Sequence, residues 1–221
     1  MAFGKDYFNS CYQDYSRQNP LRKHLWYLSL LRKHGAAGVL LDIGCSYGLF
    51  AERGGRFLRC IGMDVSPEVV AEAASRVPYA SFVAGKLPDV PFRGVDVVTA
   101  LDVLEHVPDP ERTLEALRGA VKPGGLVLVV MPVYDGPLGP VVACLDHDPT
   151  HIHKCSRTFW LDMLSRYFQV VEWWGVFRKL LAGKVYVHMP TMLFRGIAPA
   201  IAVVLRNGAL PSTARTEEGG P

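Results

Sequence analysis

Residues 39–64 read VLLDIGCSYGLFAERGGRFLRCIGMD, and this stretch decides the fold class. An apolar run reaches a turn at Gly44, a helical pattern starts near Gly48, and a second apolar run ends in Asp64. In a strand–turn–helix unit of this kind, backbone N–H groups and the positive end of the helix point at one small ligand. An acid that closes the next strand lies at the right separation to hold ribose hydroxyls. The stretch predicts either a nucleoside-cofactor cradle or an ordinary strand–turn–helix unit with glycines in its turn.

Apolar runs alternate with helical patterns along most of the chain. The apolar runs lie at 39–43, 58–64, 80–84, 95–100, 125–131 and 168–175, and the helical patterns lie near 48–55, 67–76, 110–120 and 157–166. Such alternation is typical of parallel α/β sheets covered by helices on both faces. We expect an α/β, Rossmann-like, doubly wound and mostly parallel seven-stranded sheet, with ligands bound beyond the carboxyl ends of its strands.

Residues 1–36 predict a helical cap on this sheet. Leucines at three- and four-residue spacing follow Pro20 and stop before Gly35, which predicts an amphipathic helix: Leu21, Leu25, Leu28 and Leu31. The aromatic residues of the cap either line a lid over a substrate or pack against the sheet: Tyr7, Phe8, Tyr12, Tyr15, Trp26 and Tyr27.

The main domain is expected over residues 37–207, and its last part, residues 183–207, is apolar and basic. Arg195 lies at the centre of this part and would cost on the order of 3 kcal/mol in a membrane-spanning helix. We therefore expect either a closing strand pair or an interfacial helix whose arginines face lipid headgroups. Residues 208–221 are expected to be a disordered tail.

The composition indicates one well-buried domain rather than a disordered chain, because 49% of the 221 residues are hydrophobic. The five cysteines are scattered and form no C-x-x-C pair, which favours a reducing compartment. No apolar segment of a secretory signal follows the first charges. We expect a cytoplasmic protein.

Charge is distributed unevenly along the chain. Residues 36–172 carry an acidic excess, whereas residues 173–216 contain six basic residues and no acid. The basic flanks either suit an anionic or lipid-facing partner or are solvated faces. We expect a small-molecule partner and no nucleic acid, and we leave peripheral membrane contact through residues 183–206 and the oligomeric state open.

The glycine turn departs from the dinucleotide-binding fingerprint. It reads D-I-G-C-S-Y-G over residues 42–48, so Ser46 stands where G-x-G-x-x-G has its second glycine and a pyrophosphate fits poorly. Two later segments add information: ALDVLEHV at residues 100–107 follows the fourth apolar run, and KPGG at residues 122–125 makes the turn before the fifth.

Together these segments resemble the class I S-adenosylmethionine-dependent methyltransferases, in the small-molecule, ubiquinone-biosynthesis-like branch (type 11/12). The resemblance covers roughly residues 37–176. It rests on five regions in chain order: LLDIGCSYG, GMDVSPEVV, FVAGKLPDVPF, LDVLEHV and VKPGG.

The resemblance implies S-adenosyl-L-methionine as the cofactor and assigns residues to it. Seven of these residues lie outside the segment that follows the third strand: Asp42, Gly44, Cys45, Gly48, Asp64, Val65 and Leu101. The glycine turn with Asp42 would surround the methionine part, and Asp64 would accept two charge-assisted hydrogen bonds from the ribose hydroxyls. Val65 would flank the adenine, and Leu101 would lie near the methyl group that is transferred.

One position departs from the family pattern. The family often places an acid after the third strand to meet the adenine amino group, but AGKLP places Lys86 there. Lysine has no acceptor atom, so it cannot replace this contact. The adenine would then rely on backbone groups of Gly85 to Leu87.

The segment DHDPTHIHKCS gathers histidines and aspartates in the loop expected after the fifth strand. In one interpretation His151, with His147 and Asp148 beside it, provides a general base that an aspartate orients. In a second, the cluster binds a divalent cation, although the reaction requires no metal and we assign none. In a third, these side chains hydrogen-bond the loop backbone and only shape the pocket.

Two further pairs have more than one interpretation. Glu105 and His106 are interpreted as a structural and cofactor-contacting pair rather than as an acid–base pair. Trp173 and Trp174 either stack on an aromatic acceptor or pack a sheet edge.

The resemblance implies methyl transfer to a small, apolar or aromatic metabolite, and we expect O-methylation with a loop histidine as general base. One alternative is a protein that binds S-adenosylmethionine without transferring its methyl group, as a structural cofactor or in a cyclisation. Others are a methyltransferase of lipids or quinones, or a simple interaction module, at a membrane surface. A nicotinamide-dependent dehydrogenase is disfavoured by Ser46 and by KPGG.

Overall fold

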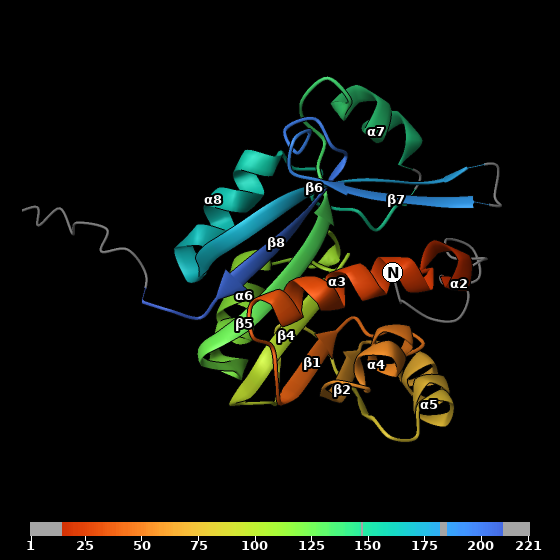
Figure 1. The fold of residues 1–221 in the computed structure, drawn as a ribbon, viewed down its shortest axis with the longest axis vertical. Helices are drawn as coiled ribbons and strands as arrows, with labels where there is room; N and C mark the ends of the chain where they lie inside the picture. Colours follow the sequence, from red (N-terminus) through yellow and green to blue (C-terminus); the bar gives the residue numbers. More distant parts are fainter. Residues whose placement is uncertain (1–14, 147, 182–184, 210–221) are drawn as a thin grey trace, which may run out of the picture.

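The computed structural model describes residues 15–146, 148–181 and 185–209, and its centre is an eight-stranded sheet (Figure 1). The strand order is β3-β2-β1-β4-β5-β8-β6-β7. Five neighbouring strands run parallel: β3 (Ser81–Ala84), β2 (Arg59–Asp64), β1 (Val39–Ile43), β4 (Val95–Leu101) and β5 (Val121–Pro132). Antiparallel pairing then adds β8 (Ala200–Arg206), β6 (Gln169–Leu181) and β7 (Val185–Thr191). The expected Rossmann-like α/β class is confirmed.

Helices cover both faces of the sheet. The described helices are α2 (Tyr15–Gln18), α3 (Leu21–Lys33), α4 (Leu49–Gly54), α5 (Pro67–Arg76), η1 (Leu104–His106), α6 (Pro110–Ala120), α7 (Gly139–Leu145) and α8 (Arg157–Tyr167). Side-chain caps fix three helix starts, because Ser66, Asp109 and Ser156 each accept a hydrogen bond from the backbone N–H three residues on. Figure 1 shows α3 crossing one face while α6 and α8 lie on the other.

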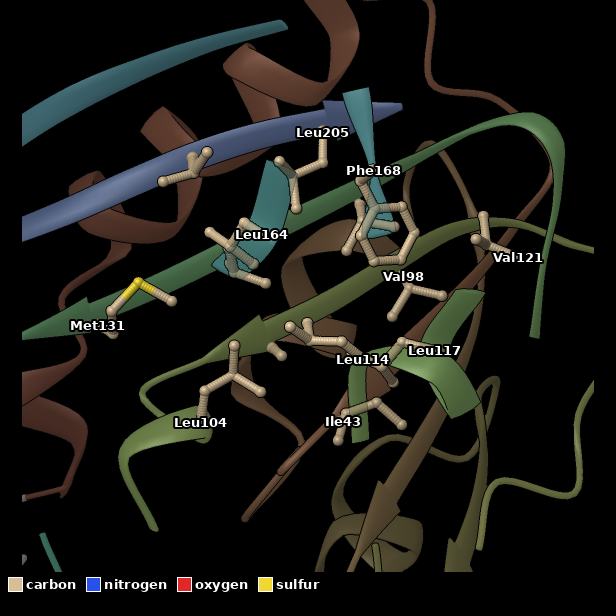
Figure 2. Packing of buried hydrophobic residues seen from close by; sticks show 14 of the residues in the cluster. Ile43, Val98, Leu104, Leu114, Leu117, Val121, Met131, Leu164, Phe168 and Leu205 are labelled. Carbon is tan, nitrogen blue, oxygen red and sulfur yellow. The ribbon is translucent and has the colours of Figure 1, made fainter. Parts of the chain in front are cut away.

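The core consists of two apolar layers, one on each face of the sheet. On the α6 and α8 side, Leu114, Leu117 and Leu164 pack against inward-facing residues of β1, β4 and β8 (Figure 2). On the opposite side, Tyr27 and Leu31 of α3 pack with Phe50 and alternate strand residues. The central strands are buried on both faces, as continuous apolar runs such as VLVVM predict.

The prediction of seven strands was wrong by one. The apolar stretch that includes residues 185–206 forms two strands, and the interfacial helix proposed for it is wrong. Pro190 has no N–H to donate, but it lies in β7 at the edge of the sheet, where a strand tolerates proline. β8 inserts between β5 and β6, so the two strands do not pair with each other. Within the described residues, no helix combines the length and apolar character needed to cross a bilayer.

The cap helix is where the pattern predicts it, but its buried face differs. Pro20 precedes α3 and Gly35 follows it with a φ of 83°. Leu21 and Leu25 are 54% and 45% exposed, whereas the buried face includes Tyr27. The leucine spacing missed this because tyrosine and histidine also supply buried ring surface. Residues 1–14 of the predicted cap and 210–221 of the predicted tail lie outside the described residues.

Candidate functional site

A pocket of about 770 Å³ opens at the carboxyl ends of β1, β2 and β4, as expected for a sheet of this type. The strand ends contribute Gly44, Asp64 and Leu101 to its lining. Residues of the cap, such as Tyr15 and Lys23, line another side. Further lining residues come from the β6–β7 hairpin and from the loop before α8, so segments far apart in the sequence surround the pocket.

The turn after β1 is tight and needs its first glycine. Gly44 has a φ of 70°, and a Cβ atom there would lie 2.6 Å from Cγ2 of Val103. The N–H groups of Gly44 and Cys45 both donate to the carbonyl of Met63, at 2.8 and 3.2 Å. Ser46 also has a positive φ, 47°, at the position where the dinucleotide fingerprint has a glycine. The turn therefore bends sharply enough to place backbone at the pocket wall.

Asp64 is the acid at the centre of this wall. Its two carboxylate oxygens accept hydrogen bonds from the N–H groups of Ser46 at 2.9 Å and Ser66 at 3.1 Å. Burial raises the pKa of Asp64, and these backbone bonds partly offset the rise. The side chain is thus held rigidly while the remaining lone pairs stay available to a ligand in the pocket.

Asp42 lies behind the pocket rather than in its lining. Its Oδ1 accepts a 2.6 Å hydrogen bond from the hydroxyl of Thr99 on the neighbouring strand β4. Burial raises the pKa of Asp42 to about 7, although the hydrogen bond from Thr99 acts to lower it. The nearby charge of Asp64 adds to the rise.

This raised pKa predicts a pH-dependent stability. The folded protein binds the proton of Asp42 more tightly than the unfolded chain does, so stability is greatest below the ordinary carboxyl pKa and is lost as pH rises through about 7. The unfolding free energy lost in this way is at most about 4 kcal/mol. In Asp42→Asn, whose amide oxygen still accepts from Thr99, we expect the fall in unfolding free energy between about pH 5 and about pH 8 to shrink, measured by urea denaturation. The control Asp89→Asn changes an exposed acid and should show the same fall in unfolding free energy as the wild type. A fall in Asp42→Asn equal to that of the wild type would contradict the prediction.

The predicted adenine end is built from backbone of the segment after β3. Gly85, Lys86 and Leu87 line the pocket, as does Val65, which directly follows Asp64 in the chain. The N–H of Gly85 donates to the carbonyl of Asp64 at 2.9 Å, which joins this segment to the end of β2.

The predicted site residues divide by position. Eight of them line the pocket: Gly44, Asp64, Val65, Gly85, Lys86, Leu87, Leu101 and His151. Four others are outside its lining: Asp42, Cys45, Gly48 and Asp148. His147 lies outside the described residues. The glycine turn and the histidine loop, far apart in the sequence, thus reach one pocket.

His151 is held by a small hydrogen-bond network. Its Nδ1 lies 2.9 Å from Oδ1 of Asp146 and 3.1 Å from the hydroxyl of Tyr134. Tyr134 donates to the other oxygen of Asp146 at 2.6 Å, and Lys154 lies 3.0 Å from it. Burial opposes ionisation of Asp146, but hydrogen bonds from these three side chains outweigh it and keep its pKa below the usual range. Nδ1 of His151 therefore carries a proton toward Asp146, which leaves Nε2 with its lone pair.

The rest of the histidine loop binds its own surroundings. Asp148 accepts from both the N–H and the hydroxyl of Thr150, at 2.9 and 2.6 Å. Nε2 of His153 donates to the carbonyl of Val107 at 2.8 Å. The other oxygen of Asp148 lies 3.9 Å from Nε2 of His151, and His151 alone of the described loop histidines lines the pocket.

An ion-pair network at the pocket was not predicted. Arg178 on β6 contacts both carboxylate oxygens of Asp102, at 2.5 and 2.7 Å, and Lys23 of α3 lies 3.8 Å from Asp102. Asp102 has a φ of 58°, which turns the chain sharply after β4. No local pattern marks Arg178, because it lies in an apolar strand 76 residues from its partner. Trp173 and Trp174 pack against the core and are outside the pocket lining.

Comparison with known proteins shows which family the sequence resembles. Residues 41–129 match a family model described as a methyltransferase domain. Over these residues the chain is similar to that family. A ubiquinone biosynthesis O-methyltransferase of Pseudomonas paraeruginosa is 36% identical over 120 residues, which is 50% of this chain and 50% of that protein. The chain thus spans about half the length of the curated relatives it matches.

Two solved structures of methyltransferases share the fold of this chain. An S-adenosylmethionine-dependent methyltransferase of Thermotoga maritima has a TM-score of 0.68 and 16% identity, over 91% of this chain and 97% of that one. The N-methyltransferase NodS of Bradyrhizobium japonicum in complex with S-adenosyl-L-homocysteine has a TM-score of 0.62 and 18% identity, over 84% and 86%.

Proposed function

We propose that this chain transfers the methyl group of S-adenosyl-L-methionine to a hydroxyl group of a small, apolar or aromatic molecule. The observation that carries the proposal is one pocket shared by Asp64, at the end of β2, and His151, in the loop before α8. Asp64 is suited to bind a nucleoside, and His151 is suited to accept a proton from a hydroxyl group. The match to a methyltransferase domain and the curated O-methyltransferase relatives support this reaction.

The residues of the pocket fit the proposed cofactor. Asp64 offers lone pairs to a ribose diol, and the apolar side chains of Val65 and Leu87 flank the space expected for adenine. Lys23 is only 5% exposed and lines the pocket, where its ammonium group suits the carboxylate of the methionine part. The bound cofactor supplies an electrophilic methyl group on a sulfonium. Asp42, Cys45 and Gly48 would support this site from behind its wall.

The acceptor would be activated by His151. Its Nε2 has a lone pair because Nδ1 donates to Asp146, so the imidazole would take up the proton that the acceptor hydroxyl loses when the methyl group leaves the sulfur of the cofactor for the hydroxyl oxygen. Asp146 then stabilises the imidazolium that forms, and Tyr134 holds Asp146 in place. Alignment of the acceptor with the methyl group would supply the rest of the acceleration.

A transfer assay with labelled cofactor tests this function. The full chain is incubated with S-adenosylmethionine carrying a labelled methyl group and a panel of phenols, aliphatic alcohols and amines, and labelled products are counted. Label on a hydroxyl compound supports the proposal, and label only on amines would replace O-methylation by N-methylation. Binding of S-adenosylhomocysteine without transfer to any acceptor would favour a non-transferring cofactor protein. Thermal stabilisation by NAD but not by S-adenosylhomocysteine would favour a dehydrogenase.

We further propose peripheral membrane contact through the segment 183–206, of which residues 185–206 are described. Large apolar side chains around the β7–β8 connection are exposed, with Leu193 84% exposed: Met189, Met192, Leu193, Phe194 and Ile197. The C-terminal third has no acid from residue 173 to residue 216, which suits an anionic bilayer. The exposed apolar residues would insert among the headgroups.

Sedimentation with vesicles tests this contact. We expect the full chain to pellet with vesicles that contain phosphatidylglycerol more than with phosphatidylcholine alone. Replacing Leu193 and Phe194 together by serine is expected to lower the bound fraction several-fold, because both side chains are more than half exposed. The matched control is Phe57→Ser, which removes a 49% exposed phenylalanine elsewhere on the surface. Equal loss in both variants, or no binding by the wild type, would overturn the proposal.

A further inference from the structure

Arg178 has hydrogen-bond donors that the fold does not use. The side chain, in β6, is 16% exposed and lines the pocket. Its contacts with Asp102, at 2.5 and 2.7 Å, are both made by Nη1. Among the residues that the structure describes, Nε and Nη2 of Arg178 donate to no acceptor. Because a guanidinium group carries N–H donors on each of its nitrogens, those on Nε and Nη2 remain available to a bound molecule.

Positive charge exceeds negative charge around Arg178. Arg178 and Lys23 both lie next to the carboxylate of Asp102. Burial opposes ionisation of Asp102, but the charges of Arg178 and Lys23 outweigh it and keep the pKa of Asp102 below its ordinary value. Asp102 is therefore ionised and balances one of these two cations. One positive charge in this cluster is left without a partner of opposite sign.

Glu105 does not supply the missing negative charge. Its side chain is fully buried and lines the pocket, and neither of its oxygens has a hydrogen-bond partner in the described part of the chain. Burial, together with the nearby charge of Asp102, raises the pKa of Glu105 well above the ordinary value. The protonated form, which this favours, is neutral and carries an O–H donor. Because a buried polar group without a partner is costly, this donor also calls for a ligand.

The proposed cofactor would not neutralise the cluster. Its methionine part has a carboxylate, which suits Lys23, but it also has an ammonium group and the sulfonium, so the cofactor as a whole is a cation. Binding of the cofactor would therefore add positive charge beside Arg178. Uncompensated charge among buried side chains is costly. A negative charge on the methyl acceptor would offset this cost.

The unused donors lie near the proposed base. One carboxyl oxygen of Glu105 and one ring nitrogen of His151 are within 4.8 Å of each other, and the charge of Arg178 also acts on Glu105. Apolar side chains of the segment after β4, Val107 and Pro108, line the same pocket. An aromatic ring packed against them would present a hydroxyl group to His151 and an acidic group to Arg178.

We propose that Arg178 and Glu105 bind a carboxylate of the methyl acceptor, which would then be a hydroxylated aromatic acid rather than a neutral molecule. Nε and Nη2 of Arg178 form the planar fork that matches the two oxygens of a carboxylate. The O–H of Glu105 would donate to the same group. The identity of the acceptor rests on the proposed methyl transfer, whereas the anion subsite does not depend on turnover.

Matched acids and amides test the subsite in the wild-type protein. The full chain, saturated with S-adenosylhomocysteine, is titrated by calorimetry with the ortho, meta and para isomers of hydroxybenzoate and hydroxyphenylacetate. The corresponding amides, which have nearly the same shape but no charge, are titrated in parallel. At least one acid is expected to bind about 10-fold or more tightly than its amide, the gain typical of charge-assisted hydrogen bonds. Absence of such a preference in every pair would overturn the proposal.

A charge-neutral double variant assigns the preference to Arg178. Arg178→Gln alone would leave Asp102 buried without its partner, so it is combined with Asp102→Asn. The ratio of acid to amide affinity is expected to fall by at least about 10-fold, while the affinity for S-adenosylhomocysteine changes far less. The matched control combines Arg166→Gln with Glu111→Gln, which removes an exposed ion pair outside the pocket lining and should keep the ratio. Circular dichroism verifies folding, and the wild-type comparison stands without the variant.

The outcomes separate the subsite from the reaction. An acid preference that survives in the double variant would overturn the proposal. Equal losses of affinity for the acid and for S-adenosylhomocysteine would assign Arg178 to the methionine carboxylate and overturn it as well. If no compound is methylated but acids still bind more tightly than amides, the proposed function fails while the subsite stands. If neutral phenols are methylated as fast as the acids, methyl transfer stands and the subsite is wrong.

Discussion

Replacing His151 by asparagine is expected to lower turnover by about 10²–10⁴-fold, the usual contribution of a general base, while the affinity for S-adenosylhomocysteine stays within about 2-fold of wild type. Asparagine can still bond to Asp146 where Nδ1 of the imidazole does, but it has no atom equivalent to Nε2. Turnover is measured on the acceptor found in the labelled-methyl assay. Cofactor affinity is measured by calorimetry.

A matched control comes from the same loop. His153→Gln keeps a donor toward the carbonyl of Val107, which the imidazole Nε2 contacts in the wild type at 2.8 Å, and turnover should change by no more than a few-fold. The turnover of Asp146→Asn should lie between those of His151→Asn and His153→Gln, because the imidazole remains but its tautomer is no longer fixed. Wild-type turnover in His151→Asn would assign the whole loop a structural role.

Replacing Asp64 by asparagine is expected to weaken cofactor binding by on the order of 100-fold or more. The neutral amide has one acceptor oxygen instead of two and carries no charge, so it loses the charge-assisted hydrogen bonds to the ribose, each worth about 1.5–3 kcal/mol. Burial already raises the pKa of Asp64, so the change removes a buried charge and is not expected to unfold the protein. Calorimetry with S-adenosylhomocysteine measures the effect.

The control for this variant is Asp89→Asn, an exposed acid outside the pocket lining. Its affinity for S-adenosylhomocysteine should equal that of the wild type. Unchanged affinity in Asp64→Asn, with the thermal stability of the variant also unchanged, would remove the cofactor assignment at the end of β2.

Local sequence patterns determined the parts of the fold that depend on neighbouring residues. Apolar runs of strand length and the helical patterns between them predicted the central elements closely. They could do so because the burial pattern of a strand or helix is set within a few residues. The same patterns placed Asp64 and His151 after strands, and a parallel sheet brings such positions to one edge.

The order of the last strands was not predictable in this way. Residues 185–206 are apolar throughout much of their length, and only pairing with β5 and β6 decides that they form two separated strands. Likewise, the leucine spacing of α3 did not reveal that Tyr27 lies at the centre of its buried face. Both depend on which surfaces meet in the folded chain.

The sequence by itself thus determined the α/β class, the glycine turn with Asp64, and the presence of a histidine-rich loop after the fifth strand. The tertiary structure alone decided which members of that loop reach the pocket, and it joined Asp102 to Arg178 and Glu105 to His151. The physical reason is that tautomers, ion pairs and buried unpartnered carboxyl groups are set by contacts between residues far apart in the chain. Such contacts exist only once the sheet and its loops are assembled.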